Sequence, residues 1–186
     1  GVYAYSICAA IVSVIYMIAM YISYGVTSGY DTETKSEGKK ISFKAMGKNI
    51  VTNPNLIGVV IHDILRMIAF YTVAAGTAYY AKVVLGDAAA SGTVLMVFFL
   101  GCFVGSFIAA RVAKKIGTKN ATLIGVGGWA VICVVCFFVQ PGFVALNVLL
   151  FVSQVLFGLA YGLSANLYSM CATWSHWKSG ENTIGT

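Results

Sequence analysis

Five long apolar stretches dominate this sequence. Each is long enough for a transmembrane helix, which needs about 20 mostly apolar residues. They lack the apolar/polar alternation of porin strands, and a helix satisfies its own backbone hydrogen bonds in lipid. The pattern therefore predicts an all-α membrane protein with five transmembrane helices, at about Val2–Tyr24, Leu56–Val83, Gly92–Ala113, Ala121–Val139 and Phe143–Tyr168.

The composition excludes a water-soluble globular domain. Hydrophobic residues make up 59% of the chain and charged residues 10%, whereas soluble domains carry about 25% charged residues. The net charge of +6 is compatible with a nucleic-acid partner, but the basic residues lie in the gaps between apolar stretches rather than on one continuous face. We therefore expect the lipid bilayer as a partner, and no nucleic acid.

Lysine and arginine gather in every second connection between the stretches. The first connection is rich in lysine, the third holds Arg111, Lys114, Lys115 and Lys119 without an acid, and the fourth, Gln140–Gly142, is uncharged. Because positive loops face the cytoplasm, we predict cytoplasmic first and third connections and a multi-pass protein of the plasma membrane. Within the first connection, Ile41–Ile50 is compatible equally with a surface amphipathic helix and with a plain loop.

The second apolar stretch contains the sequence's one cluster of ionisable residues inside a span: His62, Asp63 and Arg66. They lie about 10–15 Å along the helix from Leu56, where each charge costs about 2.5–3.5 kcal/mol. Asp63 and Arg66 are three residues apart and can pair on one face. Such a pair either lines a solute pathway or holds helices together, and we favour the pathway. His62 is a weaker candidate, either at the same cavity or as a proton carrier.

Polar residues of the fifth stretch form a second candidate group. Asn147, Gln154 and Tyr161 are spaced by seven and therefore share a stripe of the helix. Amide and aromatic side chains suit the hydroxyl groups of sugars, which makes Gln154 and Tyr161 candidate substrate-binding residues. The same side chains also hydrogen-bond between helices, and the pattern favours that packing role.

Small residues recur at the spacing of helix contacts. They include Gly101 and Gly105, Gly125, Gly127 and Gly128, and Gly158 and Gly162, and we expect them to serve packing alone. Cys133 and Cys136 form a C-x-x-C inside an apolar run, where thiolates are unfavourable, so packing is again expected. The sequence lacks the common hydrolase and phosphate-binding motifs. We expect no enzyme, and a membrane enzyme using His62 and Asp63 is the least favoured alternative.

Three segments together resemble the glycoside–pentoside–hexuronide:cation symporter family, the melibiose-carrier branch of the major facilitator superfamily. Lys48–Leu56, which contains Asn53-Pro54, is similar to the start of that family's seventh helix. Ala113–Lys119 is similar to its basic loop between helices eight and nine. Trp174–Asn182 is similar to the signature that follows helix ten.

The resemblance implies a partial major facilitator superfamily helical bundle. Residues 1–24 would be the last helix of the N-terminal half, residues 25–54 the cytoplasmic central loop, and residues 55–186 a partial C-terminal half of four helices and a tail. The implied function is symport of a sugar or glycoside with a cation, Na⁺ or H⁺, by alternating access. The family's cation site lies in its first half, so the chain would need further N-terminal and C-terminal helices as partners, with no other cofactor.

Three positions depart from the family pattern. His176 stands where a glutamate is usual, Thr173 where many members have aspartate, and Ala110 where the superfamily's basic loop carries an acid. Because those acids help to latch the cytoplasmic side in relatives, gating here is expected to differ. The alternative function is a non-transporting membrane scaffold or subunit whose polar residues only stabilise helices.

Overall fold

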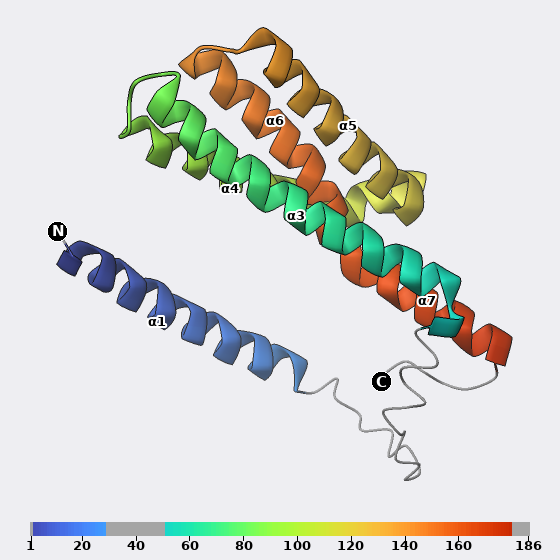
Figure 1. Ribbon diagram of the computed structural model, residues 1–186. Helices are drawn as coiled ribbons and strands as arrows, with labels where there is room; N and C mark the ends of the chain where they lie inside the picture. Colours follow the sequence, from blue (N-terminus) through green and yellow to red (C-terminus); the bar gives the residue numbers. More distant parts are fainter. Residues whose placement is uncertain (1, 29–50, 180–186) are drawn as a thin grey trace. The chain divides into compact units, whose positions relative to one another are not determined.

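The computed structural model describes residues 2–28 and 51–179, and helices make up nearly all of this part (Figure 1). Within it, five helical segments are long and apolar enough to cross a membrane: Ser6–Thr27, Pro54–Val83, Ala90–Ile116, Thr118–Val139 and Phe143–Ser175. The predicted all-α class and the number of spans are confirmed. The predicted central loop lies largely outside the described residues, as does its segment Ile41–Ile50.

Helix α1, Val2–Thr27, belongs to the first of two compact units. Its described side chains are exposed and apolar on every side of the helix, from Ile7 to Val26. A helix that is apolar all round is typical of a membrane span. The prediction of a membrane span for this segment therefore rests on its apolar composition, because the helix has no amphipathic face that would select a packing partner.

The second unit contains the remaining helices, whose direction alternates from α3 to α6 (Figure 1). They are α3 (Pro54–Val83), α4 (Ala90–Ile116), α5 (Thr118–Val139), α6 (Phe143–Gly162) and α7 (Ser164–Ser179). Three of the predicted spans begin two to three residues too late, since polar residues such as Thr118 extend the first turn. As a result of the alternation, Lys114, Lys115 and Lys119 lie at the same end of the unit as the start of α3.

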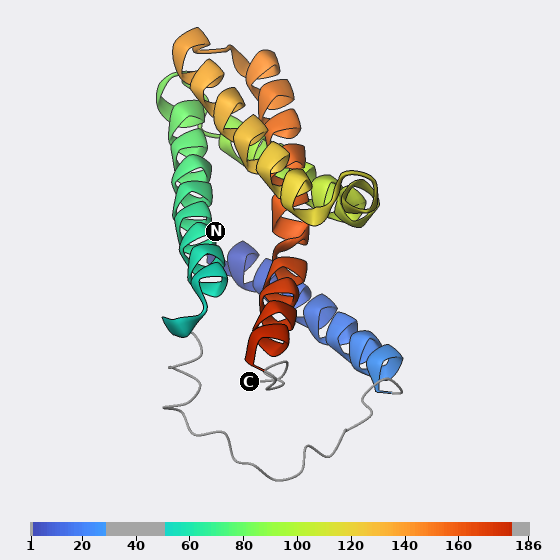
Figure 2. The ribbon, with the colours of Figure 1, turned by 90° about the vertical axis from the view of Figure 1, so that its right-hand side faces the viewer.

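The predicted fifth span is two helices rather than one. Helix α6 ends at Gly162, and α7 begins at Ser164 and continues nearly along the same line (Figure 2). Leu163 between them has φ −100° and ψ −3°, and its N–H donates to Ala160 O instead of continuing the regular ladder. The prediction missed this break because the apolar run continues past it to Tyr168, although Gly162, Ser164 and Asn166 surround Leu163.

Asn53 fixes the start of α3. Its Oδ1 accepts hydrogen bonds from the backbone N–H groups of Asn55 and Leu56, and Pro54 occupies the first helical position, where no N–H is needed. Its Nδ2 donates to the carbonyl of Cys171 in α7 at 3.2 Å. One buried side chain therefore both caps α3 and links it to α7.

Replacing Asn53 with alanine is expected to destabilise the unit by about 1 kcal/mol through loss of the cap. Asn53→Asp keeps the acceptor for the cap but cannot donate to Cys171, so its deficit reports the lost link to α7 together with the cost of a buried carboxylate beside that carbonyl. Thermal unfolding in detergent compares the variants. An Asn53→Ala protein as stable as the wild type would show that the cap is not needed.

Glycines bring α6 close to α4 along the largest helix interface of the unit. A Cβ at Gly105 would lie 2.9 Å from Gly158 Cα, and one at Gly158 would lie 2.9 Å from Ser106 N. Ser106 Oγ also donates to Gly158 O at 3.1 Å across this interface. The predicted packing role is confirmed for these glycines. It is wrong for Gly127, which faces open space with no atom within 4 Å of its Cβ position.

Candidate solute-binding site

Arg66 and Asp63 form an ion pair on one face of α3. Arg66 Nη2 donates to Asp63 Oδ1 at 2.8 Å, as the spacing of three residues predicts. The side chain of Arg66 is 2% exposed and that of Asp63 is 18% exposed. A buried guanidinium is tolerated because a carboxylate neutralises it, and removing one partner would leave the other charge uncompensated.

The same guanidinium nitrogen connects α3 to the break between α6 and α7. Arg66 Nη2 donates to Ser164 Oγ at 2.9 Å, and Ser164 is the first residue of α7. The Ser164 hydroxyl in turn donates to Ala160 O in α6 at 3.4 Å. The charged group of α3 is thus attached to the point at which the fifth span changes from one helix to the next.

Aromatic rings of α6 cover the other side of Arg66. Arg66 Cζ lies 5.5 Å from the centroid of the Phe157 ring and 5.3 Å from that of Tyr161. Phe70 of α3 stacks on Phe157 at 4.6 Å, and Trp129 of α5 meets its edge at 5.0 Å. Rings at these distances stabilise a cation through their negative faces.

Two nitrogens of Arg66 are not used by this network. In the described part of the chain, Nε and Nη1 are buried and have no hydrogen-bond partner. Buried donors in native proteins are nearly always paired, so unpaired ones call for a ligand or an ordered water. The cluster therefore combines a carboxylate, two spare charged donors and aromatic rings, and this set of groups is able to bind a polyhydroxylated solute.

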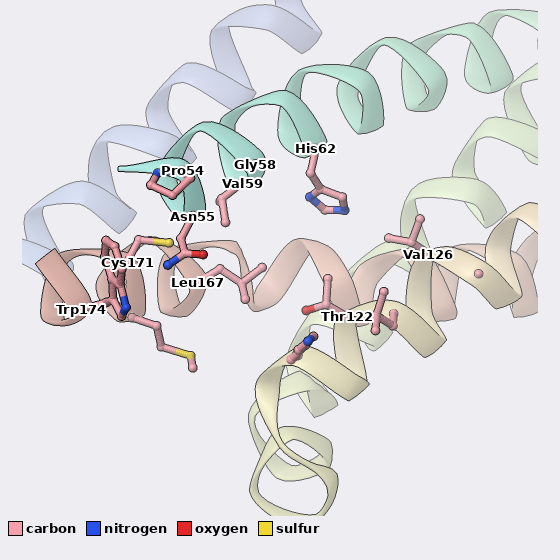
Figure 3. Close-up of a pocket in the computed structure, with 14 residues that line it drawn as sticks. Pro54, Asn55, Gly58, Val59, His62, Thr122, Val126, Leu167, Cys171 and Trp174 are labelled. Atoms are coloured by element: carbon pink, nitrogen blue, oxygen red, sulfur yellow. The ribbon is translucent and has the colours of Figure 1, made fainter. Parts of the chain in front are cut away.

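His62 lies beside this cluster but faces a groove. Its Nδ1 is 3.4 Å from Asp63 Oδ1, and its side chain is 33% exposed. Figure 3 shows the imidazole pointing from α3 toward α5, with Thr122 opposite. The groove has a volume of about 830 Å³ and lies between α3, α5 and α7, at the end of the unit where α3 and α5 begin. His62 is therefore next to the ion pair and accessible from the groove, whereas the side chain of Arg66 is buried.

The predicted stripe of polar residues on α6 is only partly brought to this cluster. Tyr161 reaches Arg66, and its side chain is half exposed. Gln154 is fully buried against α4. Its Cβ lies 2.9 Å from the position that a Cβ added at Gly101 would take. Among the described residues, both polar atoms of the Gln154 amide lack a hydrogen-bond partner. Asn147 Nδ2 donates within its own helix, to Phe143 O at 2.8 Å.

Three residues of the cluster are absent from the predicted site. Ser164 and Phe157 contact Arg66, and the Tyr168 side chain interacts with Asp63. The polarity of Ser164 is visible in the sequence, but its partner is about a hundred residues earlier in the chain. Phe157 carries no sequence signal, since a phenylalanine in an apolar helix is ordinary.

A second groove, of about 510 Å³, lies at the opposite end of the unit, between α3, α5 and α6. Cys133 and Cys136 line it as free thiols, together with Thr77 and Tyr80. The hydroxyl of Tyr80 donates to Pro141 O at 3.1 Å and so connects the end of α3 to the turn before α6. The two grooves lie on either side of the Arg66 and Phe70 level of α3.

The chain matches a known protein family over nearly its whole length. A family profile described as MFS/sugar transport protein covers residues 3–186. No curated protein and no solved structure matches the chain. The match confirms the superfamily part of the predicted resemblance and leaves the melibiose-carrier branch a prediction. The helical fold and this match show that the chain belongs to the MFS/sugar transport protein family of multi-pass membrane transporters.

Proposed function

We propose that this chain is part of a cation-coupled symporter that moves a sugar or glycoside across the plasma membrane by alternating access. The observation that carries the proposal is the buried Arg66, with Asp63 on one side, two aromatic rings on the other and two unpaired donors. Charged groups this deep in a membrane protein commonly mark a solute or ion pathway.

The chemistry of the cluster suits a sugar. Vicinal hydroxyl groups match the fork of an arginine and the two oxygens of a carboxylate, which form short, charge-assisted hydrogen bonds. The apolar face of a pyranose or furanose ring packs on aromatic rings such as Tyr161. In this proposal Asp63 and Arg66 bind hydroxyl groups, Tyr161 stacks on the ring, and Gln154 supplies an amide if the helices separate. His62 stands apart from the solute because it faces the groove.

The domain assignment belongs to the same proposal. Residues 1–24 form the last helix of an N-terminal half, residues 25–54 a cytoplasmic loop, and residues 55–186 a partial C-terminal half. The three motifs that resemble the glycoside–pentoside–hexuronide:cation symporters support this order. The bound solute would lie near the middle of the membrane, as in transporters built from repeated bundles.

Counterflow of labelled sugars in proteoliposomes of the intact protein tests the proposal. We expect one class among monosaccharides, disaccharides, glycosides and uronides to exchange. Tyr161→Phe should retain exchange because it keeps the ring, and Tyr161→Ala should lower it by about tenfold, the effect of about 1–1.5 kcal/mol of lost ring contact.

A folded wild-type protein that exchanges none of these solutes would favour the alternative, a membrane scaffold in which the ion pair only holds helices together. Equal exchange by Tyr161→Ala and Tyr161→Phe would remove Tyr161 from the site. Immunodetection of each variant in the reconstituted vesicles separates loss of exchange from loss of protein.

A further inference from the structure

We infer that His62 is a proton-binding site, and that its protonation competes with Arg66 for the carboxylate of Asp63. The inference rests on the proposed transport function and names its coupling ion as H⁺. It places coupling within residues 51–179, whereas the resemblance assigns the cation site to another part of the protein. Distances, access and the local charges carry it.

One carboxylate oxygen serves both cations. Asp63 Oδ1 is 2.8 Å from Arg66 Nη2 and 3.4 Å from His62 Nδ1. While His62 is neutral, Arg66 holds the carboxylate. When His62 takes up a proton, it becomes a second positive charge 3.4 Å from the same oxygen. The attraction between Asp63 and Arg66 then weakens, because one negative charge is divided between two positive ones.

Access differs sharply between the two cations. The side chain of His62 is 33% exposed and lines the 830 Å³ groove, whereas that of Arg66 is 2% exposed. A proton reaches His62 from the groove without passing the ion pair. Histidine is also the side chain that ordinarily changes charge between about pH 5 and 8. Of the two cations, His62 is therefore the one that a proton in the groove reaches.

Among the charged and titratable groups around His62 in the described residues, Asp63 is the one acid. Helix α3 supplies Asp63 and Arg66. Helix α5 supplies Lys119, whose positive charge lines the same groove, and α7 supplies Tyr168 beside Asp63 and Cys171 at the groove wall. Lys178 lies over the Trp174 ring, which also borders the groove. A protonated His62 is consequently stabilised chiefly by Asp63, at the expense of Arg66.

Solute and proton therefore help each other to bind. A proton on His62 loosens Arg66 from Asp63, and the guanidinium becomes more available to solute hydroxyls. By linkage, a solute that engages Arg66 frees Asp63 to hold the protonated histidine. Cooperative binding of two ligands is the thermodynamic requirement of symport. The proton moves from water to the imidazole and back to water, with no other group consumed.

The test measures proton movement and solute exchange separately, in vesicles that contain the intact protein. In weakly buffered vesicles with a pH-sensitive dye, addition of the transported sugar should make the outside medium more alkaline. His62→Gln should abolish this change, because glutamine cannot take up a proton. Its sugar counterflow should persist at saturating sugar, because exchange needs no net proton movement. Half-maximal exchange should need more sugar than in the wild type, because Arg66 stays on Asp63.

Thr122→Val is the matched control, since Thr122 borders the same groove but does not titrate; it should keep both proton movement and counterflow. His62→Asn is the second variant if His62→Gln does not fold. Sugar-driven proton movement that persists in a histidine-free variant would overturn the inference. So would a wild-type protein with counterflow but no proton movement, although the proposed sugar transport would survive. Absence of counterflow from the wild type with every sugar would instead refute the proposed function.

Discussion

Replacing Arg66 with glutamine is expected to lower sugar uptake by at least about 30-fold while the protein still inserts into the membrane. Removing one partner of a buried, charged hydrogen bond costs about 2–5 kcal/mol, and each 1.4 kcal/mol is about a factor of ten. Arg66 makes such bonds to Asp63 and Ser164 and lies over two rings. Uptake of labelled sugar, normalised to the protein in the membrane, measures the effect.

Arg66→Lys is the control for charge. A lysine keeps the positive charge but lacks the planar fork, whose unpaired Nε and Nη1 are the donors that the proposal gives to solute hydroxyl groups. We expect its uptake to lie between that of the wild type and that of Arg66→Gln. If lysine restores full uptake, the charge alone matters and the proposed binding of hydroxyl groups by the fork is wrong.

Asp63 separates a transport role of the pair from a structural one. Asp63→Asn leaves a buried, uncompensated guanidinium, which destabilises a protein by about 3–5 kcal/mol. The double variant Asp63→Asn with Arg66→Gln removes both charges, and its thermal stability in detergent should recover most of that loss. Its uptake should not recover. A double variant that transports normally would show that the pair only holds helices together.

The local parts of this site follow from the sequence, because they depend on spacing along one helix. Asp63 and Arg66 are three residues apart, so their side chains share one face of the helix and can pair. Helix lengths follow from apolar runs, and the start of α3 from Asn53-Pro54. These features involve neighbours within four residues, so a single sequence contains the information that specifies them.

The remaining parts depend on which helix faces which. Ser164 contacts Arg66 only because α7 packs on α3, and the break at Leu163 lies inside a stretch that hydropathy joins into one span. Gly127 lies in the same short run as Gly125 and Gly128 but faces open space instead of a neighbouring helix. Spacing indicates that small residues share a face, yet only the packed structure tells which face has a partner.

Three glycines provide a graded test of that packing, with the largest loss of stability expected for Gly105→Ala. Its Cβ would lie 2.9 Å from Gly158 Cα, a backbone atom that cannot move aside. Overpacking of this kind costs about 1–3 kcal/mol and sometimes more. Here the two helices must also separate, which stretches the bond from Ser106 to Gly158. Thermal unfolding in detergent should show this variant as the least stable of the three.

Gly128→Ala and Gly127→Ala complete the series on α5. The new methyl at position 128 would meet Leu156 Cδ1 at 2.8 Å, the flexible end of a side chain that can rotate, so a small loss is expected. The methyl at position 127 would meet nothing, and alanine should stabilise the helix by up to about 1 kcal/mol. All three substitutions gain the same helix propensity, so differences between them report packing alone. Equal stability of the Gly105 and Gly127 variants would therefore mean that α4 and α6 do not meet along their glycines.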